Sequence, residues 1–340
     1  MTGPAYRKLL VTGGLGFIGS SYVRLLLSET DLAVVNLDLM TYAANPATLR
    51  EFEGDPRYTF IKGDIADPEV VGRALEGCDA IVNFAAETHV DRSIQDATPF
   101  IRSNVEGVRV LLEAARGRGV RMVHISTDEV YGEVMTGLSR ESDAFRPRSP
   151  YSASKAGGDL LVGAYATTYG TDVVTTRGSN NYGTHQFPEK IIPLFVTNAL
   201  DDKPLPVYGS GRAIRDYIFV TDHVRGVHAA LLRGKSGEAY NLGGQNQTDG
   251  LTVAKTVLEA LEKPESLIQY VADRPGHDYR YALDIDKAGR DLGWRPQVTF
   301  AEGIARVVAW YRDNRAWWEG HKAGQAAYFR AQYEGREARP

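Results

Sequence analysis

The stretch "LLVTGGLGFIGS", residues 9 to 20, decides the fold of this 340-residue chain. It begins as a short apolar strand and ends as the start of a helix, and the turn between them holds Gly13, Gly16 and Gly19 in the pattern G-x-x-G-x-x-G. Glycines at these positions let the backbone approach a pyrophosphate and let the helix pack closely on the strand. The helix N-terminus attracts the negative charge of a phosphate. The stretch therefore predicts a dinucleotide site.

Asp38 ends the next strand-like run, "LAVVNLD", at the spacing of about 20 residues that is typical of a ribose-binding acid. A carboxylate there binds the ribose diol and would repel the 2′-phosphate of NADP. We therefore predict NAD as the cofactor. A glycine turn with a capping aspartate is the alternative, but it does not explain why strand, turn, helix and acid follow one another.

Short β-rich runs alternate with longer helical patterns through the first half of the chain. The runs are "RKLLVTG", "LAVVNLD", "RYTFIKGD", "DAIVNFAAE", "VRMVHIST" and "TDVVTTRGSN". This alternation predicts an α/β protein with a Rossmann-type, doubly wound parallel sheet. After about residue 180 the strands become shorter and sparser, which predicts a smaller C-terminal α/β lobe for the substrate. We place the NAD-binding domain at residues 1–178 plus about 214–242, and the nucleotide-sugar-binding lobe at 179–213 and 243–330.

The composition is that of an ordinary globular protein, with 43% hydrophobic and 24% charged residues. The 39 basic and 43 acidic residues give a formal net charge of -4, and no long run of either sign indicates nucleic acid or a membrane as partner. Cys78 is the only cysteine, so an intrachain disulfide is excluded, and the sequence shows no signal peptide or long apolar segment. We predict a cytoplasmic enzyme without a metal site.

Tyr151 and Lys155 stand at i and i+4 in "SPYSASKAGGDLL", which starts at a proline as helices often do. Both side chains then lie on one helix face, so the ammonium can stabilise a phenolate. Lowering a tyrosine pKa from about 10 to near 7 takes roughly 4 kcal/mol, which Lys155 and a positively charged nicotinamide would supply. A chance pair on a solvated face is the alternative, and the glycine turn and Asp38 weigh against it.

Two adjacent carboxylates, Asp128 and Glu129, follow an apolar strand in "HISTDEVYGE", residues 124 to 133. Acids at the carboxyl end of a buried strand are either solvated loop residues or catalysts. Taken singly, Asp128 is equally explained as a turn cap and Glu129 as a surface residue. The residues alone leave this choice open.

The motifs together resemble the nucleotide-sugar 4,6-dehydratases of the extended short-chain dehydrogenase/reductase family, above all those that act on dTDP-glucose. The resemblance covers nearly the whole chain, from "VTGGLGFIGS" to "LGWRP". The glycine turn and Tyr-x-x-x-Lys are shared by relatives with other activities. "STDEVYG", "FPEKIIP" and "DRPGHDYRY" are much more specific.

The resemblance implies a lyase that converts dTDP-glucose to its 4-keto-6-deoxy product and water. Tyr151 would take the C4 hydroxyl proton, Glu129 the C5 proton, and Asp128 would protonate the departing C6 hydroxyl. Hydride would leave C4 for NAD and return to C6. The implied catalytic residues are Thr127, Asp128, Glu129, Tyr151 and Lys155.

The resemblance also implies two binding sets. The NAD-binding residues are Gly13, Gly16, Phe17, Ile18, Gly19, Asp38, Thr41, Asp64, Ile65, Ala85, Ala86, Tyr151, Lys155 and Asn181. The substrate-binding residues are Thr88, Thr127, Asn180, Lys190, Ile191, Pro206, Tyr208, Arg215, Asn246, His277, Arg280 and Tyr281. Among these, we expect Arg215 and Arg280 to pair with the diphosphate, because guanidinium groups bind phosphate oxygens bidentately.

Three positions depart from the family pattern: Ala44 replaces glycine, Thr184 replaces proline and Tyr217 replaces tryptophan. None belongs to the acid–base set, so they leave the nucleotide less certain than the reaction. A 4,6-dehydratase of another nucleotide sugar, or a UDP-sugar 4-epimerase or decarboxylase, is therefore an alternative. A non-catalytic dinucleotide sensor is a third, in which Tyr151 and Lys155 would be dispensable.

The helix that starts at Tyr151 has more apolar surface than one sheet contact requires, at Leu160, Leu161, Ala164 and Tyr165. The segment "NVEGVRVLLEAA" has the same character. Relatives pair such helices in a dimer, so we predict a homodimer.

Overall fold

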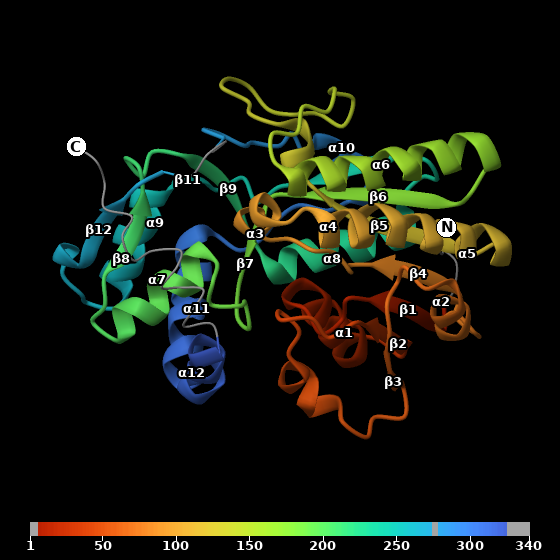
Figure 1. The fold of residues 1–340 in the computed structure, drawn as a ribbon, viewed down its shortest axis with the longest axis horizontal. Coiled ribbons are helices and arrows are strands. Elements are labelled where there is room, and N and C mark those ends of the chain that lie inside the picture. The colour runs from red at the N-terminus through yellow and green to blue at the C-terminus, as the bar shows by residue number, and fades with distance from the viewer. Residues whose placement is uncertain (1–5, 274–277, 325–340) are drawn as a thin grey trace.

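The computed structural model describes residues 6–273 and 278–324. Its main sheet has seven strands in the order β10-β6-β5-β4-β1-β2-β3, and all neighbours are parallel. The strands are β1 (Lys8–Thr12), β2 (Ala33–Asp38), β3 (Tyr58–Lys62), β4 (Ala80–Asn83), β5 (Arg121–Thr127), β6 (Val173–Gly178) and β10 (Ala239–Leu242). This is the strand order of a Rossmann sheet with one strand added, and it confirms the predicted fold class (Figure 1).

Helices cover both faces of this sheet, which is why its strands are nearly continuous apolar runs. Leu9, Leu10 and Val11 of β1, for example, are fully buried. One face packs against α1 (Phe17–Glu29), α8 (Val220–Arg233) and α10 (Asp286–Leu292). The other packs against α2 (Pro68–Ala74), α5 (Val108–Arg118) and α6 (Pro150–Tyr169).

Short elements connect these layers. They are the 3-10 helices η1 (Pro46–Phe52), η3 (Asp128–Tyr131) and η4 (Glu265–Leu267), the helices α3 (Val90–Gln95) and α4 (Thr98–Ile101), and the π-helical turn η2 (Arg102–Gly107). The turn η2 runs directly into α5. A π-helical turn inside a helix often marks a functional site.

A second lobe lies at the left of Figure 1 and has its own hydrophobic core. Its helices are α7 (Ile191–Leu200), α9 (Gly250–Ala260), α11 (Phe300–Asp313) and α12 (Arg315–Gly324). Its strands are the parallel pair β8 (Leu205–Tyr208) and β12 (Ile268–Val271). A three-stranded sheet of β7 (Asn180–Tyr182), β9 (Ile214–Phe219) and β11 (Gln247–Asp249) completes the set. The exact domain bounds stay a prediction.

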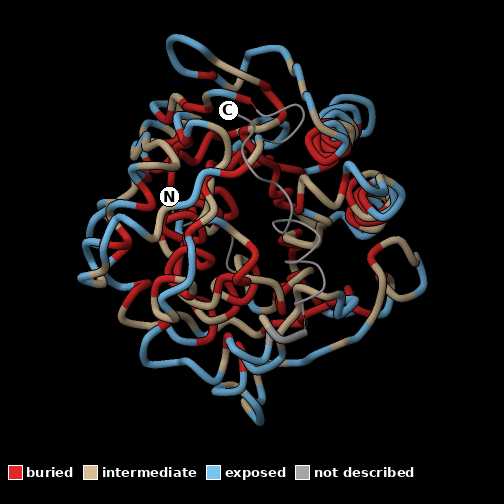
Figure 2. The backbone as a smooth tube through the Cα atoms, turned by 60° about the vertical axis from the view of Figure 1, so that its left-hand side comes forward, coloured by how far each residue is buried: buried red, intermediate tan, exposed pale blue. Residues whose placement is uncertain are grey.

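Buried residues follow the strands and the inward helix faces, while exposed residues follow the outer loops (Figure 2). Within residues 6–273 and 278–324, no helix has both the length and the apolar character needed to span a bilayer.

The turn between β1 and α1 brings strand and helix close together at the cavity. A Cβ atom at Gly19 would lie 2.1 Å from the carbonyl oxygen of Gly13, and a Cβ at Gly13 would lie 2.6 Å from the backbone nitrogen of Ala85. Gly13 also has φ +71°, a left-handed conformation that favours glycine. Both glycines are therefore required by the fold itself.

We expect Gly19→Ala to lower the free energy of unfolding by about 1–3 kcal/mol, because backbone must move to admit the methyl group. Gly117→Ala in α5 is the matched control, since no atom lies within 4 Å of its added Cβ. Removing a helical glycine there should stabilise the fold by about 0.5–1 kcal/mol. Urea unfolding followed by circular dichroism measures both. Equal effects of the two substitutions would contradict the close approach.

Candidate active site

The carboxyl ends of the parallel strands open into a cavity of about 460 Å³ that also borders the second lobe. All fourteen residues predicted to bind NAD line this cavity, and so do all five predicted catalytic residues. Ligands of open α/β sheets bind at this edge. The structure therefore brings both sets into one space, although they come from segments far apart in the sequence.

The β1–α1 turn has the features of a pyrophosphate cradle. Gly16 is the N-cap of α1 and supplies no side chain to cap the first N–H groups, and the first turn contains no acidic residue. Those N–H groups and the positive end of the helix dipole are left for an anion. The close packing of Gly13 and Gly19 leaves no room for side chains there. The turn thus fits the phosphates of NAD.

Asp38 lies at the end of β2, held in place by the backbone. Its carboxylate accepts hydrogen bonds from the Leu15 nitrogen (2.9 Å) and the Met40 nitrogen (2.8 Å). Burial raises the pKa of Asp38, and the two backbone hydrogen bonds oppose that rise. The carboxylate lines the cavity in a fixed orientation, which is consistent with the predicted contact to a ribose diol.

The adjacent acids begin the 3-10 helix η3, immediately after β5. Thr127 pairs with Gly178 in the β5–β6 ladder. Its hydroxyl donates to the Asp128 carboxylate (3.2 Å) and accepts from the Glu129 nitrogen (3.3 Å). This Thr127 cap turns the chain out of the sheet, so that both carboxylates line the cavity.

The two carboxyl groups differ in environment. Asp128 is 3% exposed, and its second carboxylate oxygen has no hydrogen-bond partner among the described residues. Burial raises the pKa of Asp128 well above its ordinary value, and the nearby charges of Glu129 and Asp216 raise it further. Burial and nearby negative charge both favour the protonated form of a carboxyl group. Asp128 is therefore suited to donate a proton.

Tyr151 and Lys155 lie on α6, which begins at Pro150 with a capping box made by Ser149 and Ser152. The Lys155 ammonium donates to the Ile125 carbonyl (2.6 Å), and burial lowers its pKa to about 8. Burial also raises the pKa of Tyr151 above its ordinary value, and Glu129 adds to the rise. Tyr151 therefore needs further positive charge in the cavity to act as a base, and an oxidised nicotinamide would bring it.

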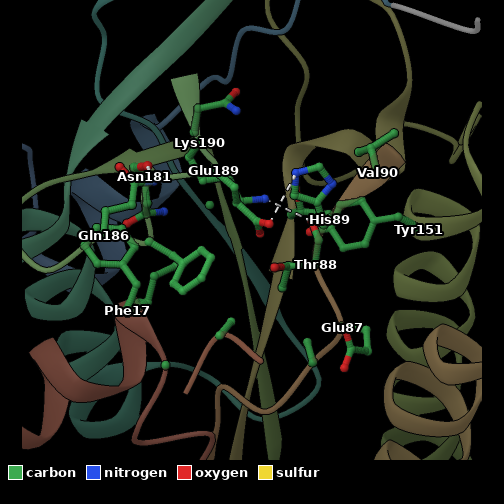
Figure 3. A pocket seen from close by; sticks show the side chains of 18 of the residues that line it. Phe17, Glu87, Thr88, His89, Val90, Tyr151, Asn181, Gln186, Glu189 and Lys190 are labelled. Carbon is green, nitrogen blue, oxygen red and sulfur yellow. Dashed lines mark hydrogen bonds and ion pairs between the residues drawn. The ribbon is translucent and has the colours of Figure 1, made fainter. Parts of the chain in front are cut away.

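A buried carboxylate with no signal in the sequence, that of Glu189, lies in the cavity lining next to His89 (Figure 3). The Glu189 side chain is 2% exposed, and its carboxylate lies 3.9 Å from His89 Nε2 and 3.5 Å from Arg92. The Tyr42 hydroxyl donates to it at 3.1 Å. Glu189 belongs to the motif "FPEKIIP", but nothing in the sequence shows that its carboxylate is buried.

Asn104 was also missed. It lies in η2, and its side-chain amide donates to the Glu87 carbonyl (3.0 Å) and to the Ser154 hydroxyl (2.9 Å). Its oxygen accepts from the Glu87 nitrogen (3.0 Å). Asn104 thereby joins the loop after β4 to helix α6. The segment "NVEG" has no sequence signal for this role.

Most predicted substrate residues also line the cavity: Thr88, Thr127, Asn180, Lys190, Ile191, Pro206, Tyr208 and Arg215. Lys190 Nζ donates to the Thr88 carbonyl at 3.4 Å. Arg215 is held from behind, because it donates to the carbonyls of Ile214 (2.8 Å) and Asp278 (2.9 Å). Its guanidinium also lies 4.5 Å from the Tyr281 ring centroid.

Three predicted substrate residues do not line the cavity, and His277 lies outside the described residues. The backbone nitrogen of Asn246 donates to the buried carboxylate of Asp216 (2.8 Å). The Arg280 guanidinium donates to Gln247 Oε1 and to two backbone carbonyls. The Tyr281 hydroxyl donates to Asp278. In this structure Asn246 and Arg280 connect segments distant in the sequence, whereas the Tyr281 hydroxyl bonds within its own segment.

Comparison with known proteins places these features in a family. The family model described as GDP-mannose 4,6 dehydratase matches residues 10–307. A dTDP-glucose 4,6-dehydratase of Actinoplanes sp. is 50% identical in an alignment of 319 positions that covers 92% of this chain and 99% of the relative. That of Escherichia coli is 45% identical in an alignment of 360 positions, gaps included, that covers 97% of this chain and 100% of the relative.

The chain is also similar to solved structures of proteins of this kind. The dTDP-glucose 4,6-dehydratase DesIV of Streptomyces venezuelae, solved with NAD bound, superimposes with a TM-score of 0.91 at 51% identity and covers 93% of this chain and all of its own. A UDP-glucose 4-epimerase of Thermus thermophilus in complex with NAD has a TM-score of 0.83 at 33% identity, with 90% of this chain and 99% of its own covered. The chain therefore belongs to the GDP-mannose 4,6 dehydratase family and, within it, to the nucleotide-sugar 4,6-dehydratases of the extended short-chain dehydrogenase/reductase type.

Proposed function

We propose that the protein is an NAD-dependent dTDP-glucose 4,6-dehydratase. The observation that supports this best is the acid pair Asp128 and Glu129, which opens on the same cavity as Tyr151 and the β1–α1 turn. The curated relatives with this activity match this chain at 45% to 50% identity over nearly its whole length. The substrate would lie between the strand ends and the second lobe, with its sugar near the acid pair.

The first chemical step belongs to Tyr151. Its phenolate takes the proton of the C4 hydroxyl, and Lys155 contributes positive charge one helical turn away. Bound NAD would supply the hydride acceptor for C4 and the hydride donor for C6. The hydroxyl of Thr127 lies beside Tyr151 and opposes the rise of its pKa, so it favours the phenolate. The C4 ketone that results makes the C5 proton acidic.

The second step uses the two acids together. Glu129 takes the proton from C5, while Asp128 gives its proton to the C6 hydroxyl, which leaves as water. Burial supports this division of roles, because it favours the protonated form of Asp128, and the charge of Glu129 favours that form further. Glu129 then returns a proton to C5 as hydride reaches C6. The product is a 4-keto-6-deoxy sugar.

A UDP-sugar 4-epimerase is the alternative from another class, and the Thermus thermophilus neighbour shows that the fold accommodates one. Such an enzyme needs Tyr151 and Lys155 but has no task for Asp128 and Glu129. The position of both carboxylates in the cavity lining therefore favours the dehydratase. A dinucleotide sensor is disfavoured on the same ground, since it needs none of these four groups. Location in the cytoplasm stays a prediction from the sequence.

The homodimer also stays a proposal, which the surface of α6 supports. Leu160 is 64% exposed and Tyr169 is 54% exposed, and Ala164 is exposed between them. Leu161 is only half-buried, whereas Tyr165 is buried and donates to Glu113 on α5. An exposed apolar face of this kind on α6 is suited to a second copy of the chain, whereas the apolar side chains of α5 are buried in the core.

The proposed reaction predicts the path of a label. With dTDP-glucose deuterated at C4, the product should be lighter by one water and should have its deuterium at C6, because the same cofactor takes and returns the hydride. C5 should gain hydrogen from solvent through Glu129. Mass spectrometry and NMR of the product measure both. Deuterium retained at C4 would identify an epimerase. Deuterium lost from the sugar would identify a simple dehydrogenase.

Glu129→Gln should remove the C5 base and leave Tyr151 and Lys155 in place. Water loss should slow by roughly 10²- to 10⁴-fold, while substrate still reduces the bound cofactor. Stopped-flow absorbance and product analysis separate the two steps. Glu133→Gln is the matched control, because its carboxylate pairs with the exposed Arg148 outside the cavity. If Glu129→Gln released water at the wild-type rate, the carboxylate would have no catalytic role.

Leu160→Lys should convert the dimer to monomers, because it places a charge in the centre of the proposed interface. Leu138→Lys is the control, since Leu138 is 41% exposed in a loop away from α6. Sedimentation velocity at micromolar concentration gives the mass of each. A wild-type protein that sediments as a monomer would refute the dimer.

A further inference from the structure

A buried ion pair that the proposed mechanism does not use lies next to the catalytic residues. Arg177 of β6 donates to both carboxylate oxygens of Asp159 on α6, at 2.9 and 3.0 Å. Arg177 is 6% exposed and Asp159 is 5% exposed. Burial lowers the pKa of Arg177, but the carboxylate of Asp159 outweighs burial and holds the pKa above its ordinary value. The geometry is that of a buried, bidentate ion pair.

The pair continues into a network of hydrogen bonds. Arg177 Nη1 donates to the Tyr131 hydroxyl (2.8 Å), and that hydroxyl donates to the Asn241 side-chain oxygen (2.8 Å). The Asn241 amide donates to the carbonyls of Ser139 (3.0 Å) and Asp284 (3.2 Å). Tyr131 is 4% exposed and Asn241 is fully buried. The four side chains thus form a chain of buried polar groups.

This network meets both halves of the catalytic site. Asp159 lies one helical turn after Lys155, and Tyr131 is the last residue of η3, the element that begins with Asp128. Arg177 connects them from β6, where it pairs with Ser126 in the ladder to β5. Helix α6, which carries Tyr151 and Lys155, is therefore connected to η3, which carries the acid pair. The side chains that connect them do not line the cavity.

We propose that Asp159, Arg177, Tyr131 and Asn241 form a positioning device that sets the acid pair relative to Tyr151 and Lys155. The proposal rests on the proposed function. Only a reaction with two acid–base stages on one bound sugar needs the acid pair and Tyr151 to be held at fixed positions relative to each other. A displacement of about 1 Å at a reacting group costs on the order of 10²-fold in rate. Fully satisfied buried networks resist such displacements.

The surrounding charges support an electrostatic part in the same device. Burial lowers the pKa of Lys155, and the Asp159 carboxylate opposes that fall. From β5 the neighbouring titratable group is His124, whose pKa burial lowers well below its ordinary value. From η3 the acids Asp128 and Glu129 face the same cavity. Asp159 therefore favours the ammonium form of Lys155, on which the Tyr151 phenolate depends.

Tyr131→Phe tests the link to the acid pair, because it removes one hydroxyl and no carbon. We expect water loss to slow by roughly 10- to 100-fold while substrate-dependent cofactor reduction stays within about two-fold of wild type. Tyr240→Phe is the matched control: Tyr240 is fully buried on the same strand as Asn241, and its hydroxyl accepts from the Lys235 nitrogen (3.0 Å). Loss of this hydroxyl should lower the melting temperature without altering the ratio between the rate of water loss and the rate of cofactor reduction.

Asp159→Asn tests the link to Lys155, because it keeps the shape and removes the charge. Cofactor reduction should slow, and the alkaline limb of its pH profile should move to lower pH, since Lys155 loses its proton more readily. Should this variant fail to fold, Tyr131→Phe still decides the proposal. Equal slowing of both steps by Tyr131→Phe, or no slowing, would overturn it. A wild-type protein that neither reduces its cofactor nor releases water would instead overturn the proposed function, and the positioning role with it.

Discussion

The seven strands of the main sheet are all parallel, so their carboxyl ends meet at one edge, and the site depends on that constraint. Asp38 ends β2, Thr127 ends β5 and Gly178 ends β6. In an antiparallel sheet, alternate ends would face opposite sides, and these residues would be separated. Because the crossovers are helical, the strand ends also receive the N-termini of helices. The cofactor site and the acid pair thus share one edge.

Burial decides how the shared edge works chemically. Asp128 and Glu129 are adjacent in sequence, and two exposed carboxyl groups would ionise at nearly the same pH. In the cavity, burial and the charge of its neighbour raise the pKa of Asp128 and so favour its protonated form, which suits Asp128 to the proposed role of proton donor. The same burial works against Tyr151 and Lys155, whose charged forms it disfavours. The site consequently favours a bound cofactor with a positive charge.

Much of this could be predicted from local patterns. The six strands of the first half, the glycine turn and the Tyr-x-x-x-Lys helix are recognisable because each rests on residues close in the sequence. Asn246, Arg280 and Tyr281 were expected at the substrate, yet in this structure they do not line the cavity. The contacts of Asn246 with Asp216 and of Arg280 with Val134 join residues distant in the sequence, and a motif does not show which acceptor a donor will meet.

Local sequence was enough to establish the parallel sheet, the β1–α1 cradle and the presence of an acid pair after a buried strand. These follow from side-chain periodicity and from backbone conformations that only glycine adopts readily. It took the folded chain to bury Glu189 beside His89 and to join Asp159 to Tyr131 through Arg177. The physical reason is that burial and hydrogen-bond partners are set by which distant segments pack together, whereas local patterns record only the conformation of each segment.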